Sequence, residues 1–212
     1  MERVLVVGAT GTTGKKIVDI LDEYRNYIPV AMIRRKEQAT QFEERNINTV
    51  LADLEKNVSH TVTGIEKVIF AAGSGGDTSK EKTLSVDQEG AIKLIDMAQV
   101  AGIKKFVMLS AMGADEPESN QDIKHYLEAK HNADEHLKAS GMPYTIVRPG
   151  ALTNDKGTDE IEASKKLGKS GEISREDVAN TLVAVLNDTT AQNKTFEILT
   201  GDTAIEEAVQ EI

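Results

Sequence analysis

The sequence predicts an α/β fold, a doubly wound parallel sheet in a three-layer αβα arrangement, built as a single domain. Short apolar runs alternate with longer stretches of helical periodicity along the 212 residues, which is typical of parallel strands joined by helical crossovers. The first run leads directly into a glycine-rich turn and a helix. The length fits one domain with a substantial core, and no change in composition marks a second.

Apolar periodicity assigns the elements in chain order. Residues 4–7 are expected to form a strand buried on both faces, and the helix after the glycines carries Ile17, Val18, Ile20 and Leu21 at helical spacing. Further strands are expected at 28–33, 48–51, 67–71, 105–109, 144–147 and 196–199. Helices are expected at 38–45, 85–101, 122–140 and 175–187, with a short one from residue 203. Gly102 and Gly141 stand where helix C-caps belong.

The stretch RVLVVGATGTTG, residues 3–14, is typical of a nucleotide-phosphate cradle. Gly8 allows a sharp turn after the strand, Gly11 removes a side chain that would keep a pyrophosphate from the backbone, and Gly14 lets the helix approach the strand. The helix N-terminus offers unpaired N–H groups to the anion. A merely structural turn is the alternative, but the position between a buried strand and an amphipathic helix favours a Rossmann-type dinucleotide site.

Two basic residues, Arg34 and Arg35, end the second strand, where an NAD site usually places an acidic residue. A guanidinium binds a 2′-phosphate that a carboxylate would repel, so the sequence favours NADP(H) over NAD(H). Strand alternation makes Arg34 the better candidate. The alternative is a solvated basic strand end. Asp53, after the third strand, would accept a hydrogen bond from the adenine amino group or act as a turn residue.

A second group of candidate residues consists of Ser110, Tyr126 and Lys130. Ser110 follows the fifth strand, and the other two share one face of the next helix because they are four residues apart. An ammonium favours the phenolate, so Tyr126 would move a proton while a nicotinamide moves a hydride. Lys130 could also hold the nicotinamide ribose, and Ser110 could donate a hydrogen bond to the substrate oxygen. Outside a dinucleotide fold, such a Tyr–Lys pair would be an ordinary surface pair.

Two glycine-bearing stretches, residues 73–78 and 150–171, follow strand ends at the edge where such sheets bind ligands. The segment 150–172 is too long for a simple connection, and we expect a flap over the nicotinamide end. Its lysines Lys165, Lys166 and Lys169 would attract an anionic substrate or form a solvated face. The four histidines lack the spacing that would place two metal ligands on one helix turn, so we expect no metal site.

The composition disfavours several kinds of partner. The net charge is −10, which argues against sequence-independent binding to nucleic acid or an anionic membrane surface, and leaves a small-molecule substrate. Cysteine is absent, which excludes disulfides and thiolate chemistry. The first strand begins at residue 3 and leaves no room for a signal peptide, so we expect a cytoplasmic protein. The oligomeric state, monomer or dimer, stays open.

Several motifs together carry a resemblance to a known family. They are GATGTTG at 8–14, IRR at 33–35, ADL at 52–54, AAGSGG at 71–76, VD at 86–87, LSAMGA at 109–114, YLEAKHNADEHLKASGMPYTIVRPG at 126–150 and ISREDVA at 173–179. On these the chain resembles, nearly end to end, the atypical short-chain dehydrogenase/reductases, in particular the small NAD(P)-binding, NmrA-like group often described as epimerases or dehydratases.

The resemblance implies a cofactor site in five parts. The pyrophosphate would be held by Gly8, Thr10, Gly11, Thr12, Thr13 and Gly14, the 2′-phosphate by Arg34, and the adenine by Asp53 and Leu54. The adenosine ribose side would be lined by Ala71, Ala72 and Gly73, and the nicotinamide by Pro149, Gly150, Ala151 and Leu152. The group varies in its use of the tyrosine, but this chain keeps Tyr-x-x-x-Lys at 126–130.

The function expected from these observations is an NADP(H)-dependent oxidoreductase that reduces a small carbonyl, quinone-like or flavin-like acceptor, with Tyr126 as general acid. A non-catalytic NADP(H) redox sensor that acts on a protein partner is the first alternative. A sugar epimerase or dehydratase is the second, although the fragment beyond Gly150 is far shorter than the substrate domain of sugar-nucleotide epimerases.

Overall fold

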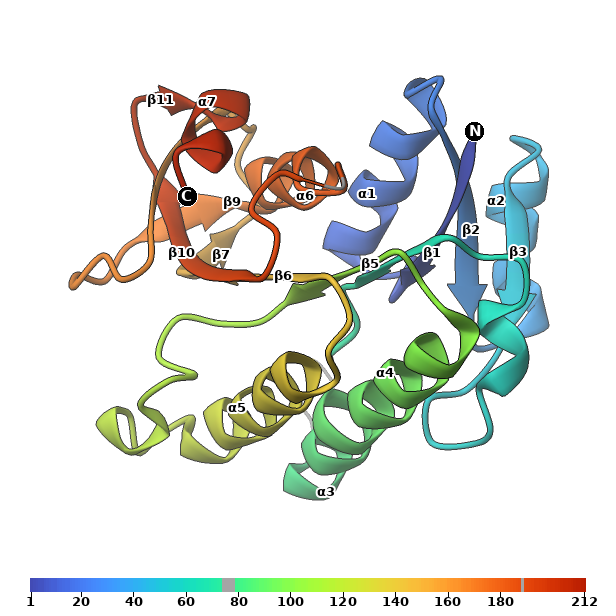
Figure 1. Cartoon of the computed structure of the whole chain (residues 1–212), viewed down its shortest axis with the longest axis horizontal. Coiled ribbons are helices and arrows are strands. Elements are labelled where there is room, and N and C mark those ends of the chain that lie inside the picture. Colours follow the sequence, from blue (N-terminus) through green and yellow to red (C-terminus); the bar gives the residue numbers. More distant parts are fainter. Residues whose placement is uncertain (74–78, 188) are drawn as a thin grey trace.

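A computed structural model describes residues 1–73, 79–187 and 189–212, and within them the expected doubly wound sheet is confirmed (Figure 1). One nine-stranded sheet has the order β11-β8-β10-β6-β5-β4-β1-β2-β3. From β3 to β10 neighbouring strands are parallel, whereas β8 runs antiparallel to β10 and β11. Its strands are β1 (Glu2–Val7), β2 (Tyr27–Ile33), β3 (Asn48–Leu51), β4 (Lys67–Phe70), β5 (Lys105–Leu109), β6 (Tyr144–Pro149), β8 (Glu160–Ser164), β10 (Lys194–Thr200) and β11 (Thr203–Ala204).

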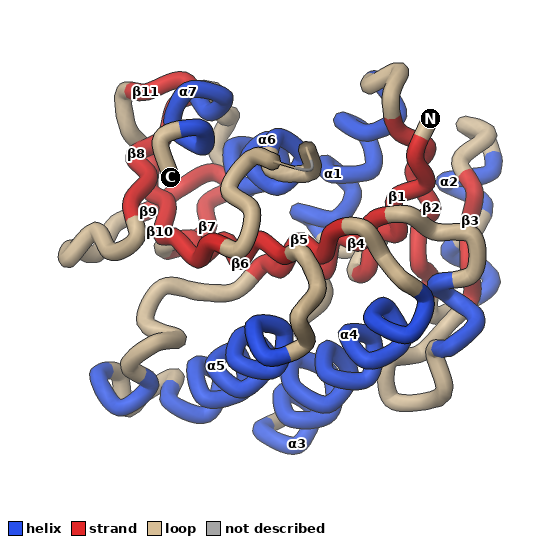
Figure 2. Tube along the Cα trace, viewed as in Figure 1, coloured by secondary structure: helices blue, strands red, loops and turns tan. Residues whose placement is uncertain are grey.

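Helices cover both faces of this sheet (Figure 2). One layer holds α1 (Thr12–Glu23), α6 (Arg175–Ala184) and α7 (Ile205–Gln210), and α2 (Thr40–Glu43) contributes Phe42 to the same core. The opposite layer holds α3 (Lys80–Thr83), α4 (Glu89–Ala101) and α5 (Lys124–Ala139). Short 3₁₀ helices lie at Lys36–Gln38, Ser59–Val62 and Pro117–Ser119.

Alternation along β1 divides the apolar residues between two cores. Val4 and Val6 pack with the α1 and α6 layer, whereas Leu5 and Val7 pack with the α4 and α5 layer. All four side chains are buried, as expected for a central parallel strand with helices on both sides. The three-layer arrangement therefore follows from the unbroken apolar character of the first strand.

Besides β11, which lies where the short helix was expected to begin, three strands were not predicted from the sequence, and all three lie in the segment 150–172 or at its end. They are β7 (Ala151–Thr153), which pairs with β9 (Glu172–Ser174) in a separate two-stranded sheet, and β8. These strands are short, and β8 reads EIEAS, which lacks an apolar run. Their pairing partners lie far away in sequence, so local periodicity could not indicate them.

Two predicted helices differ from the structure in detail. The helix expected at 38–45 is a 3₁₀ turn followed by the single-turn α2. The helix expected at 85–101 is preceded by α3 and by a π-helical turn at Leu84–Gln88, so that continuous helical structure begins at Lys80. The C-cap predicted at Gly102 is confirmed, with φ of +71°.

Candidate functional site

The turn between β1 and α1 can accept only glycine at two positions. Gly8 has φ of +86°, and a Cβ there would lie 2.7 Å from both the carbonyl oxygen of Ala71 and the amide nitrogen of Ala72. A Cβ on Gly14 would lie 2.0 Å from the carbonyl oxygen of Gly8. The first glycine thus permits close contact with the chain leaving β4, and Gly14 lets α1 pack against the turn.

The N-terminus of α1 presents backbone donors at this turn. Gly11 is the N-cap residue and has no side chain to cap the helix, and the first turn carries no acidic residue. The N–H groups of the first turn lack helical acceptors, and the helix dipole adds positive potential. Thr12 and Thr13, the first of them exposed and the second buried, stand in this turn. The arrangement suits a pyrophosphate.

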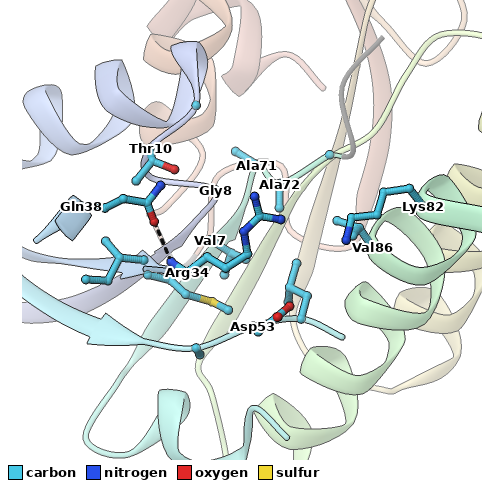
Figure 3. Close-up of a pocket in the computed structure, with 16 residues that line it drawn as sticks. Val7, Gly8, Thr10, Arg34, Gln38, Asp53, Ala71, Ala72, Lys82 and Val86 are labelled. Atoms are coloured by element: carbon cyan, nitrogen blue, oxygen red, sulfur yellow. Dashed lines mark hydrogen bonds between the residues drawn. The ribbon is translucent and has the colours of Figure 1, made fainter. Parts of the chain in front are cut away.

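A cavity of about 260 Å³ opens beside this turn, at the carboxyl ends of β1, β2, β3 and β4 (Figure 3). Most of the residues predicted to bind the adenosine half of a cofactor line it: Gly8, Thr10, Gly11, Arg34, Asp53, Leu54, Ala71, Ala72 and Gly73. Thr12, Thr13, Gly14 and Arg35 are not in its wall. The rest of the glycine-rich stretch predicted at 73–78 lies outside the described residues. We call this space the first cavity.

Strand alternation separates the two arginines at the end of β2. Arg34 extends into the first cavity (Figure 3). Arg35 is exposed and is not part of the cavity wall. Gln38 fixes the backbone here, because its Oε1 accepts hydrogen bonds from the N–H groups of Arg34 at 3.0 Å and Arg35 at 2.9 Å. Asp53 lines the same cavity and also acts as a turn residue, since its Oδ1 accepts a hydrogen bond from the N–H of Glu55 at 3.1 Å.

Sequence reasoning missed two polar residues of the first cavity, Gln38 and Lys82. Gln38 was assigned only to a helix, although its position just after the arginines was a signal. Lys82 belongs to α3 and points toward the cavity in Figure 3. Its side chain forms an ion pair with Glu55. No pattern in the sequence indicates this position, because it depends on the path of the chain that enters α3.

A second cavity of about 540 Å³ lies at the carboxyl ends of β5 and β6. It brings together Ser110 and Tyr126 with the four residues predicted to pass beside the nicotinamide, Pro149, Gly150, Ala151 and Leu152. Most of the other lining residues are apolar or small, among them Ala111, Met112, Gly113, Ile123 and Leu127. Tyr126 is half-buried in this wall.

The hydroxyl of Ser110 is hydrogen-bonded to a buried carboxylate. Its Oγ donates a hydrogen bond to Asp134 Oδ2 at 2.8 Å, and the same oxygen accepts two from Arg148, from Nε at 3.1 Å and Nη2 at 2.9 Å. Because two guanidinium N–H groups point at this oxygen, it carries no proton, and the serine hydroxyl must be the donor. In this arrangement Ser110 offers lone pairs to the second cavity, and its donation to a substrate oxygen stays a prediction.

The carboxylate that orients Ser110 is fully buried. Burial raises the pKa of Asp134, and the charge of Arg148 and the hydrogen bonds from Ser110 and Arg148 oppose this shift. Arg148 also lies 3.5 Å from Asp115, through Nη1 and Oδ1. A chain of charged groups thus runs from Asp134 on α5 through Arg148 on β6 to Asp115 in the loop after β5.

Lys130 is buried and lines neither cavity, and its contact with a nicotinamide ribose stays a prediction. Its side chain is 5% exposed, and Nζ lies 3.1 Å from Asp87 Oδ1, on the π-helical turn. The ammonium lies 5.6 Å from the centroid of the Tyr126 ring. Burial acts to lower the pKa of Lys130, but the charges of Tyr126, Asp87 and Asp134 outweigh it and raise the pKa.

The segment 150–172, predicted to be a flap, is held at several points. The N–H of Ala151 donates to the carbonyl of Gly171 at 2.9 Å, and β8 is paired with β10. Lys166 contacts Asp115 at 3.0 Å and Glu116 at 2.5 Å, and Lys169 contacts Glu162 at 2.5 Å. Lys165 is exposed. Residues 150–152 and 169–171 line the second cavity, so both ends of the segment reach the site.

The described residues contain no group of three or more His, Cys, Asp or Glu side chains that could hold a metal ion. His60 and His131 contact backbone carbonyl oxygens, and His136 contacts Asp96. None of the helices within the described ranges combines the length and apolar character that a membrane crossing requires.

The glycine turn, the open helix N-terminus and the row of strand ends define a dinucleotide-binding α/β domain. Residues 8–189 match the family described as NAD(P)H-binding, and the chain belongs to that family. This membership confirms the resemblance to the atypical short-chain dehydrogenase/reductases, and the chain is an NAD(P)-dependent oxidoreductase of this type.

Three comparisons illustrate the relationship. The chain is 42% identical to YhfK of Bacillus subtilis, described as an uncharacterized sugar epimerase, over 99% of this chain and 100% of that protein. A solved structure from Bacillus halodurans, described provisionally as an NAD-dependent epimerase/dehydratase, is 40% identical, covers 100% of both chains and has a TM-score of 0.96. The NAD(P)H azoreductase of Xenophilus azovorans is 28% identical over 95% of this chain and 69% of its own length.

Proposed function

We propose that this oxidoreductase reduces a small conjugated acceptor with NADPH, and that the nicotinamide and the acceptor meet in the second cavity. The proposal rests on the position of the two cavities, which lie side by side at the carboxyl ends of the parallel strands. The first cavity spans the ends of β1 to β4, and the second continues along the same sheet edge at β5 and β6. A dinucleotide laid along this edge would have its adenosine at Arg34 and its nicotinamide beside Pro149.

Tyr126 is the proposed general acid. Bound NADPH would supply a hydride, and the reduced acceptor would need one proton. The phenol of Tyr126 would donate that proton, and the resulting phenolate would then take a proton from water. The buried ammonium of Lys130 faces the tyrosine ring and stabilises negative charge on the resulting phenolate. Ser110 presents lone pairs and so orients an N–H or O–H group of the bound molecules.

The lining of the second cavity supports a flat, largely apolar acceptor such as a quinone, an isoalloxazine or an azo compound. The name of the Xenophilus azovorans relative points to an azo acceptor for that protein. Residues 169–171 of the segment 150–172 would cover the nicotinamide end of the site.

Steady-state kinetics of Tyr126→Phe test the mechanism. With menadione, FMN and methyl red as acceptors, this substitution should lower kcat/KM by roughly 10²-fold. Tyr24→Phe is the matched control, because Tyr24 is exposed and lies away from both cavities. Turnover that is equal in the two variants would refute the role of Tyr126. Tight NADPH binding without turnover of any acceptor would instead favour a redox sensor.

Thermal-shift titration with NADPH, NADP⁺, NADH and NAD⁺ tests the cofactor preference. Arg34 supports a preference for the 2′-phosphorylated forms, so NADPH should stabilise the protein at lower concentration than NADH. A ligand at 100 times its Kd adds about 2.7 kcal/mol to the free energy of unfolding. Equal stabilisation by NADH and NADPH would refute the preference, and stabilisation by a UDP-sugar would favour the epimerase alternative.

A further inference from the structure

The carboxylate of Glu55 is surrounded by donors from separate elements at the edge of the first cavity. It forms an ion pair with Lys82 of α3, and its Oε1 accepts a hydrogen bond from Ser85 Oγ at 2.9 Å. The hydrogen bonds from Lys82 and Ser85, and more weakly the charges of Lys82 and Arg34, lower the pKa of Glu55. Glu55 is therefore a fixed negative charge near two cationic residues.

The two cations and the carboxylate are placed differently with respect to the cavity. Arg34 and Lys82 both line it and approach it from different elements, the end of β2 and α3 (Figure 3). Glu55 is not part of the wall, although its side chain and that of Lys82 are both about one third exposed, at 35% and 34%. Lys82 thus faces the cavity while its charge is balanced from outside the cavity.

A phosphate monoester matches these two cations better than a carboxylate does. At neutral pH it carries a charge of about −1.5 to −2 and three acceptor oxygens. A guanidinium and an ammonium can share these oxygens through charge-assisted hydrogen bonds. The ribose of NADP(H) carries such a group, and that of NAD(H) does not.

We propose that Arg34 and Lys82 together form a phosphate-monoester site, and that Glu55 competes with the 2′-phosphate of NADP(H) for Lys82. The inference rests on the proposed NADPH cofactor and adds two residues that set its selection. Glu55 lowers the affinity for the 2′-phosphate by neutralising Lys82 and by repelling the incoming dianion. NADH is unaffected by this competition because it places no charge there.

Calorimetric Kd values for NADPH and NADH in four variants test this inference. Glu55→Gln should increase the preference for NADPH over NADH about threefold to tenfold, and Lys82→Met should decrease it by a similar factor. Glu81→Gln and Lys80→Met carry the same charge changes on α3 but lie outside the first cavity, so they should leave the preference unchanged. Adenosine 2′,5′-bisphosphate compared with 5′-AMP should repeat the pattern without a nicotinamide.

Combining Glu55→Gln with Lys82→Met distinguishes competition for Lys82 from a direct electrostatic effect of Glu55 on the bound phosphate. If Glu55 acts through Lys82, the gain from Glu55→Gln should shrink markedly in the double variant. The gain should also weaken as salt is raised, since the groups are partly exposed.

Several results would overturn the inference. One is an NADPH preference that neither Glu55→Gln nor Lys82→Met changes, and another is a preference that Glu55→Gln lowers. If Glu81→Gln and Lys80→Met changed the NADPH preference as much as Glu55→Gln and Lys82→Met do, net charge alone would explain the effect. If neither dinucleotide binds the native protein, the cofactor assignment itself fails and takes this inference with it, a result distinct from binding without a Glu55 effect.

Discussion

The buried ion pair beneath Tyr126 should be among the most sensitive points of the molecule. The side chains of Asp87 and Lys130 are 0% and 5% exposed, and their charged atoms lie 3.1 Å apart. Lys130→Met removes the cation but keeps most of the side-chain volume, so a cavity contributes little. Removing one partner of such a pair costs about 3–5 kcal/mol, because it leaves a buried charge without its counter-ion.

Urea denaturation gives this free energy, with Lys138→Met as the control. Lys138 lies on the same helix and pairs with Glu135 at the surface, 2.7 Å away, so its loss should cost less than about 1 kcal/mol. The double variant Asp87→Asn/Lys130→Met should recover part of the loss, because no net buried charge remains. A Lys130→Met cost no larger than that of Lys138→Met would refute the reasoning.

The pH dependence of the free energy of unfolding lost in Lys130→Met provides a second check. The pKa of Lys130 is raised in the folded protein, because Tyr126, Asp87 and Asp134 together outweigh the effect of burial. Such a group stabilises the fold fully below its unfolded-state pKa, and the stabilisation is lost only as pH rises through the higher folded-state value. The cost of Lys130→Met should therefore be constant from about pH 7 to about pH 9.

Three other substitutions test further parts of the fold. Gly14→Ala would place a Cβ 2.0 Å from the carbonyl oxygen of Gly8, so it should lower Tm and weaken NADPH binding at least about tenfold, whereas the exposed Lys15→Ala should do neither; unchanged binding would contradict this. Burial acts to raise the pKa of Glu2, but two lysines outweigh it and lower the pKa. The Glu2 carboxylate therefore stabilises the folded protein less as pH falls and it becomes protonated. Between about pH 5 and about pH 3, the urea midpoint of the native protein should drop more steeply than that of Glu2→Gln. Asp177 accepts hydrogen bonds from the N–H groups of residues 158 and 159, so Asp177→Ala should expose the segment 150–172 to limited proteolysis, and an unchanged cleavage pattern would argue against this anchoring.

The parts of the fold that could be predicted are those encoded by local patterns. Central parallel strands such as β1 and β4 have short apolar runs, and the first glycine turn lies directly between a strand and a helix. Alternation along β2 correctly separated Arg34 from Arg35, because one residue changes the face of a strand. β8 could not be predicted, since its polar sequence EIEAS is stabilised by pairing with β10, more than thirty residues further along the chain.

The candidate site was likewise predictable only in part from local sequence patterns. Ser110 and Tyr126 were placed at the second cavity by their positions after β5 and on α5. Their hydrogen-bonding roles were not predictable, because the direction of the Ser110 bond depends on Arg148, which adds two donors to the same Asp134 oxygen. The ion pair of Lys130 with Asp87 was not predictable either, because Asp87 is presented by a π-helical turn.

The class of this protein can be established from its sequence, because glycine spacing, strand ends and the arginine after β2 are local features with local physical causes. Tertiary packing determines which atoms face the ligand. It commits the Ser110 proton to Asp134, buries the Lys130 ammonium and sets Lys82 between Glu55 and the first cavity. Hydrogen-bond direction and charge balance depend on every neighbour of a group at once, and those neighbours come from distant parts of the chain.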